Sequence, residues 1–234
     1  MNNEINFETY LFASKNKFII CVIHKASFET IYKDQMILED NYNDLNFKRL
    51  NEFLENNIFK IEKILKNFIK NIYLILDSKE FFSVRLSIKK NNNGNFINTN
   101  TLIHPLNELK NSCQLNFNEK KIIHILIENY LIDNKSYSSL PQNQKCNFFS
   151  IDVNFICLPK NFIDDLEKIL KKYHIFLSQI LYADYVKNLI DENHSNLFTT
   201  ASRIKSGWNE NEVLLVNKTF KNKGFFEKFF DFFN

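Results

Sequence analysis

The order of apolar patterns in the first 80 residues is the feature that most constrains the fold. Three strand-length runs come first, and the middle one, KFIICVIH, is rich in Ile and Val. These runs cover residues 9–13, 17–24 and 28–38. A helical pattern then covers residues 47–68, with Asp44 or Asn46 as its expected cap, and the helix is expected to end near Asn71. A fourth strand-like run covers residues 72–76. This order predicts one sheet that opens with an antiparallel meander and is covered by the helix.

From Phe81 the pattern changes to that of a second sheet. Strands are expected at residues 81–88, 121–128, 130–137 and 147–158. The second and third of these strands are expected to pair as a hairpin. The segment KKNNNGNFINTN (89–100) is predicted to be an exposed loop. A helical pattern covers residues 102–115, and its Pro105 is tolerable only in a first turn.

The last third of the chain returns to mixed structure. We expect a helix at 161–173, a strand at 175–181, a helix at 183–190 and a strand at 213–216. The polar residues 192–211 are expected to form a connector that contains a short helix around 198–204.

Composition sets further limits. The chain has 234 residues, 44% of them hydrophobic, so it can form a core and is not disordered along its length. A net charge of +3 does not point to nucleic acid, and 3 Gly and 3 Pro argue against a glycine-rich phosphate site. No apolar run approaches the roughly 18 residues that span a bilayer, and no secretion signal is expected. The four scattered cysteines indicate reduced, buried thiols of a cytoplasmic protein (Cys21, Cys113, Cys146 and Cys157).

The chain carries no motif of a known catalytic or metal site, so we expect no catalytic residue, no metal and no cofactor. His24 and His124 lie within apolar strands and are interpreted as hydrogen-bonded structural residues, because a metal site needs several converging donors. Asp164 and Asp165 are placed in the first turn of a helix, where they favour the helix dipole. Three dispersed lysine pairs are interpreted as solvated (Lys89–Lys90, Lys120–Lys121 and Lys171–Lys172).

The C-terminal segment GFFEKFFDFFN stands apart. On a helix its phenylalanines form one apolar stripe, opposite two acidic residues and a lysine. Two interpretations are open: a terminal helix that packs on its own domain, or an interfacial helix that lies in a membrane surface. The second assigns membrane binding to Phe225, Phe226, Phe229, Phe230, Phe232 and Phe233, with Lys221 and Lys223 at anionic headgroups.

Residues 121–191 resemble the bacterial actin-like cell-division protein FtsA, and the resemblance extends over about the first 200 residues. In that family a strand of the form hxIPxxYxVDG leads through a loop to a strand of the form LxVDVHxVxxP. The matching segments here are IIHILIENYLIDN (122–134) and FSIDVNFICLP (149–159). A helix, a strand and a second helix follow in both.

The resemblance implies an α/β (α+β) fold, in which a truncated actin-like (ribonuclease H-like) subdomain, 1A, is interrupted by a small SHS2-type subdomain, 1C. Subdomain 1A is assigned to residues 1–80 and 159–202, and 1C to residues 81–158. A connector is assigned to 203–222, and an amphipathic, membrane-targeting helix to 223–234.

Departures from the family pattern bear on nucleotide binding. The first phosphate loop, D-x-G-x-x-K, corresponds to residues 12–17, where Phe12 and Ser14 replace the Asp and the Gly and only Lys17 is retained. The second loop, D-x-G-x-G-T, has no counterpart, and residues 192–234 are too few for a second lobe. We therefore expect neither ATP binding nor direct binding to the tubulin-like FtsZ.

These observations favour a non-enzymatic adaptor in bacterial cell division, peripheral on the inner face of the cell membrane. Its expected partners are division or envelope-assembly proteins, or a second copy, through the 1C-like subdomain, and no nucleic acid. A pilus or secretion scaffold of the PilM type is the alternative, because it shares the inserted subdomain. A soluble nucleotide-binding enzyme of the actin and sugar-kinase superfamily is disfavoured, because it needs glycine-rich loops and an Asp that holds magnesium.

Overall fold

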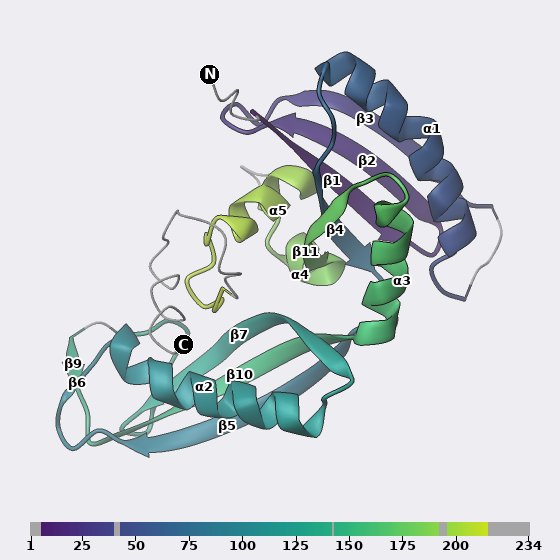
Figure 1. The fold of residues 1–234 in the computed structure, drawn as a ribbon. Helices are drawn as coiled ribbons and strands as arrows, with labels where there is room; N and C mark the ends of the chain where they lie inside the picture. Colours follow the sequence, from purple (N-terminus) through teal and green to yellow (C-terminus); the bar gives the residue numbers. More distant parts are fainter. Residues whose placement is uncertain (1–5, 40–42, 142, 192–195, 215–234) are drawn as a thin grey trace. The chain divides into compact units, whose positions relative to one another are not determined.

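The computed structural model describes residues 6–39, 43–141, 143–191 and 196–214 (Figure 1). The chain has a mixed α/β fold and divides into two compact units. Unit 1 contains residues Met1–Glu80 and Lys160–Arg203, and unit 2 contains Phe81–Pro159 and Ile204–Asn234. Unit 1 is therefore discontinuous in sequence, because unit 2 is inserted between two of its elements.

Unit 1 contains a five-stranded sheet in the order β11-β4-β1-β2-β3. Its strands are β1 (Phe7–Ser14), β2 (Lys17–His24), β3 (Thr30–Ile37), β4 (Asn71–Asp77) and β11 (Phe176–Tyr182). The first three strands form the predicted antiparallel meander, and β4 and β11 continue the sheet in parallel with β1. The middle strands are almost continuously buried, since helices lie on both faces of the sheet.

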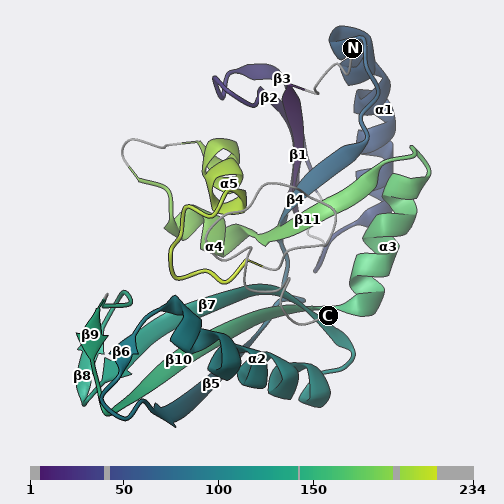
Figure 2. The same ribbon diagram turned by 60° about the vertical axis from the view of Figure 1, so that its left-hand side comes forward.

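Helices α1 and α3 lie on one face of this sheet and α4 and α5 on the other (Figure 2). Their bounds are α1 (Phe47–Leu65), α3 (Lys160–Lys171), α4 (Ala183–Asn188) and α5 (Leu197–Lys205). Asn46 caps α1, since its side chain accepts a hydrogen bond from the Arg49 N–H. The rings of Phe47 and Phe162 lie 5.3 Å apart and join α1 to α3.

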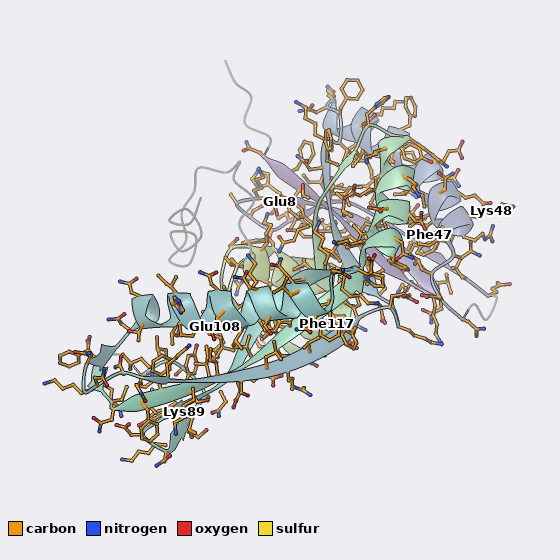
Figure 3. The ribbon with its side chains drawn as sticks, turned by 60° about the horizontal axis from the view of Figure 1, so that its bottom comes forward. Glu8, Phe47, Lys48, Lys89, Glu108 and Phe117 are labelled. Atoms are coloured by element: carbon orange, nitrogen blue, oxygen red, sulfur yellow. The ribbon has the colours of Figure 1, made fainter. Side chains whose placement is uncertain are left out.

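Unit 2 contains an antiparallel sheet in the order β5-β10-β7-β8, with α2 along one face (Figure 3). Its elements are β5 (Phe82–Asn91), β6 (Phe96–Ile97), α2 (Thr99–Asn116), β7 (Lys120–Ile132), β8 (Lys135–Tyr137), β9 (Gln144–Lys145) and β10 (Phe148–Pro159). Alternate residues of β10, among them Val153 and Phe155, form the core together with Leu102 and Leu106 of α2.

Two segments of unit 2 differ from the sequence prediction. Residues 89–100 are not one loop, because β5 continues to Asn91, which pairs with Phe148, and α2 begins at Thr99. The helix begins there because Asn98 and Thr101 form a reciprocal capping box. Pro105 consequently lies in the second turn rather than the first.

The predicted hairpin at 121–137 is also wrong in its position. Strand β7 runs through Ile132, because a bulge at Glu128 absorbs one residue and the pairing with β10 continues beyond it. The turn to β8 is made by Asp133 and Asn134, both with positive φ, a conformation that Asp and Asn tolerate better than most residues.

The segment after α5, which lies within the connector assigned to 203–222, pairs with β7 near the strand expected at 213–216. The Ile127 N–H donates to the Asn211 carbonyl oxygen, and the Val213 N–H donates to that of Ile125, both at 2.9 Å. Leu126 and Glu212 form the antiparallel bridge between these two bonds. The described residues of this segment therefore add a short edge to the sheet of unit 2. Among the helices of the described residues, none is both long and apolar enough to cross a membrane.

Candidate functional site

The turn between β1 and β2 occupies the position at which the sequence suggests a phosphate loop. Lys15 and Asn16 form this turn, and the Ser14 hydroxyl lies 2.8 Å from Asn16 Oδ1 and 3.0 Å from the Lys17 carbonyl oxygen. Phe12 is buried in the sheet. The polar groups of Ser14 and Asn16 are thus directed into the turn itself, which leaves a tight hairpin rather than a glycine-lined cradle.

A partly buried polar cluster joins β1 to α5 within unit 1. The Tyr10 hydroxyl donates to Glu8 Oε2 at 2.6 Å, and the Ser202 hydroxyl donates to the same oxygen at 3.2 Å. Burial is the main cause that raises the pKa of Tyr10 far above its usual value, and the negative charge of Glu8 is the second. Burial also raises the pKa of Tyr73, which stacks on Tyr10, to about 12. The raised pKa values keep both phenols uncharged well above neutral pH.

Both strand histidines are hydrogen-bonded, as predicted. His24 Nδ1 contacts the Ser27 hydroxyl at 3.2 Å. His124 is fully buried, and its Nδ1 lies 2.7 Å from Glu212 Oε1, so this contact fastens the segment after α5 to β7. Among the described residues, no group of three or more His, Cys, Asp or Glu side chains could hold a metal ion.

Further candidates from the sequence have structural roles. Helix α3 begins at Lys160, so Asp164 and Asp165 lie in its second turn, not its first, and Asp165 pairs with Lys168 at 2.8 Å. All four cysteines are buried as free thiols. Burial raises the pKa of Cys157 to about 12, so this thiol is not a nucleophile at neutral pH.

The face of the unit 2 sheet opposite α2 carries hydrogen bonds between polar side chains of all four strands. Asp152 of β10 accepts from Ser87 of β5 and from Asn129 of β7, and Asn129 accepts from Ser136 of β8. On the same strands, the Glu128 carboxylate accepts hydrogen bonds from the side chains of Arg85 and Asn154. Arg85 neutralises Glu128, and the donors to Asp152 are neutral side chains, so this surface offers mainly hydrogen bonds to a partner.

A second surface lies where α1 ends and β4 begins, and we call residues 59–70 together with Phe176 the α1–β4 surface. Helix α1 ends at Leu65, not near Asn71 as predicted, because Lys66 adopts the left-handed conformation (φ 49°) and its N–H donates to the Glu62 carbonyl oxygen. The Phe176 N–H donates to the Lys70 carbonyl oxygen at 2.9 Å, which joins the first residue of β11 to this end of the sheet.

The α1–β4 surface combines exposed apolar and basic side chains. Phe59 is 74% exposed, Ile64 53%, Phe68 73% and Phe176 68%. Four exposed lysines lie in the same segment, Lys60, Lys63, Lys66 and Lys70. Sequence analysis missed this surface, because it assigned Phe68 to the buried stripe of the helix. The available signal was Phe59, which lies opposite that stripe.

The residues that the sequence assigns to membrane binding lie outside the described residues. They are Lys221, Lys223, Phe225, Phe226, Phe229, Phe230, Phe232 and Phe233.

No protein-family model matches the sequence, and the comparison with curated proteins gives no match. A number of solved structures are similar to this chain at low identity, and two of them illustrate the likeness. One is the cytoplasmic domain of EpsL, an inner membrane component of the type II secretion system of Vibrio cholerae, with 11% identity and a TM-score of 0.37 over 75% of this chain and 56% of that one. The other is a PilM–PilN type IV pilus biogenesis complex, with 6% identity and a TM-score of 0.46 over 76% of this chain and 48% of that one. The chain thus spans about half the length of these two chains, and neither is described as a cell-division protein.

Proposed function

We propose that this chain is a non-enzymatic adaptor that works at a membrane surface and has the architecture of a reduced actin-like scaffold. Unit 1 would correspond to the 1A-type subdomain and unit 2 to the SHS2-type insertion. The C-terminal segment that contains Phe225–Phe233 would bind the inner face of the cell membrane. Unit 2 would contact an assembly protein or a second copy of the chain.

The discontinuous unit 1 is the observation that carries this proposal. Its meander is followed by a helix and by strands parallel to β1, and the chain leaves the sheet after β4 and returns to it through α3. Within the insertion, β5, α2, β7 and β10 follow one another as strand, helix, strand and strand. This order supports the layout that the resemblance to FtsA implies.

The β1–β2 turn supports the non-enzymatic part of the proposal. A phosphate-binding turn in the expected position needs a glycine for close backbone approach and an Asp near the metal. Here Ser14 and Asn16 are hydrogen-bonded within the turn, and Phe12 is part of the core.

The cellular setting has two candidates that share the inserted subdomain. The first is cell division, to which the resemblance points. The second is a pilus or secretion assembly of the PilM type. The two differ in the proteins that unit 2 would bind. Mixing the purified chain with cytoplasmic segments of division proteins, and separately with those of pilus or secretion proteins, tests which partner class unit 2 recognises.

Co-sedimentation with anionic liposomes tests the membrane function. The full chain is expected to sediment with vesicles, and a 1–222 truncation is expected to bind more weakly. If the full chain stays in the supernatant, the membrane proposal is wrong.

Thermal unfolding with and without ATP and Mg²⁺ tests the remaining enzyme hypothesis, because a bound nucleotide would raise the unfolding temperature.

A further inference from the structure

Exposed apolar side chains are concentrated on the α1–β4 surface. Phe176 donates the main-chain bond to Lys70, Phe68 lies two residues before Lys70, and both aromatic side chains are more than two-thirds exposed. Ile64 lies in the last turn of α1 and is 53% exposed, and Phe59 lies one turn earlier. Scattered apolar residues need no explanation, but several in one short segment favour an interaction site.

The charge of this surface is strongly basic. Residues 59–70 contain four lysines and one glutamate. Among the residues that the structure describes, none of these four ammonium groups is in an ion pair, whereas Lys168, Lys171 and Lys187 of the same unit all pair with carboxylates. The glutamate, Glu62, is half-buried, and its Oε1 accepts a hydrogen bond from the Ile69 N–H at 3.1 Å. Its carboxylate is therefore engaged with the backbone, and the four lysines dominate the field outside.

This combination fits the surface of an anionic bilayer. Lysines are attracted to anionic headgroups, and their long stems allow the ammonium to stay at headgroup level while neighbouring apolar groups sit deeper. Phenylalanine and isoleucine gain free energy at the boundary between headgroups and acyl chains. A nucleic acid would use the lysines and could stack on the aromatic rings, but it has no apolar layer to receive Ile64.

We propose that the α1–β4 surface is a second membrane contact, which binds anionic headgroups through its lysines and inserts its apolar side chains among the lipids. This inference rests on the proposed membrane function and adds a folded surface to the C-terminal segment. Two contacts on one chain bind a membrane far more tightly than either alone, because the second binding event is intramolecular.

The test uses the full chain and vesicles of phosphatidylcholine, with and without phosphatidylglycerol. In one variant Lys63→Gln, Lys66→Gln and Lys70→Gln are combined, which removes three charges from the surface. The matched control combines Lys79→Gln, Lys121→Gln and Lys135→Gln, three exposed lysines elsewhere in the chain. A third variant, Phe68→Ser, removes an apolar side chain without a change in charge.

The surface variant is expected to bind phosphatidylglycerol vesicles about 100-fold more weakly, the loss that corresponds to three lysines near an anionic surface. Phe68→Ser is expected to weaken binding about tenfold or more. The control should bind nearly as the unmodified chain does, and all variants should keep its unfolding temperature.

The outcomes separate this inference from the proposed function, because every variant keeps the C-terminal segment. If the unmodified chain binds and the surface variants bind equally well, the inference is wrong and the membrane function stands. If the unmodified chain does not bind phosphatidylglycerol vesicles, both are wrong. If the surface variant keeps vesicle binding but loses binding to a single-stranded oligonucleotide, the surface is a nucleic-acid site and the inference is wrong.

Discussion

The Thr9 hydroxyl offers a direct test of the packing in unit 1. Thr9 lies in the middle of β1, pairs with Val22 of β2 and is only 1% exposed. Its Oγ1 has no hydrogen-bond partner among the described residues. A buried hydroxyl without a partner costs about 1–3 kcal/mol. Replacement by valine keeps the shape of the side chain and removes this cost, and valine is favoured in strands.

We therefore expect Thr9→Val to stabilise unit 1 by about 1–2 kcal/mol, which raises its unfolding temperature by about 3–6 °C. Thr9→Ser keeps the hydroxyl and removes a buried methyl group, so it should destabilise the unit by about 1 kcal/mol. Thermal melts followed by circular dichroism measure both variants. Trp208, the single tryptophan, lies in unit 2, so its fluorescence should be little changed. A lower unfolding temperature for Thr9→Val would refute the reasoning, because it would mean that the hydroxyl is bonded in the folded protein.

Three further predictions concern other parts of the chain. Glu212→Ala should lower the free energy of unfolding of unit 2 by about 3 kcal/mol, because it removes the carboxylate that His124 contacts at 2.7 Å in the interior. Urea unfolding followed by Trp208 fluorescence measures this loss, and an unchanged midpoint would contradict the prediction. Lys66→Gly should stabilise unit 1 by about 0.5–1 kcal/mol in thermal melts, since glycine adopts a φ of 49° without a Cβ penalty, and a loss of stability would count against it. At pH 8, the fraction of Cys157 that is alkylated should follow the fraction of protein unfolded by urea, because burial raises the pKa of this thiol to about 12. Rapid labelling of the folded protein would contradict this prediction, because it would show that the thiol is accessible.

The elements of unit 1 could be predicted because their signals are local. Strand β2 coincides with the run at residues 17–24, and the apolar spacing of α1 reflects its packing on the sheet. The end of α1 could not be predicted in the same way. Lys66 is not a residue expected in the left-handed conformation, and this residue is what turns Phe68 away from the core.

In unit 2 the errors arise from interactions between segments distant in sequence. The bulge at Glu128 depends on the register between β7 and β10, which no local pattern encodes. The burial of Glu212 depends on its contact with His124, 88 positions earlier. The candidate surface was missed for a related reason. Its residues come from α1, from the segment 66–70 that follows α1, and from β11, and only the parallel pairing of β4 with β11 brings Phe176 to Lys70.

The ends of the insertion have a consequence for how such a chain could have evolved and how it could be re-engineered. Phe82, at the start of β5, pairs directly with Cys157, near the end of β10. The two points at which the polypeptide passes into and out of the insertion are therefore neighbours, so a short turn could replace the whole segment at little cost in chain entropy. The segment around Val213 would be left behind, however, since it supplies a strand edge to β7 from beyond the insertion. If the insertion were grafted into another protein, the segment around Val213 would have to be transferred with it. If the insertion were lost in evolution, selection would favour loss or remodelling of the segment around Val213.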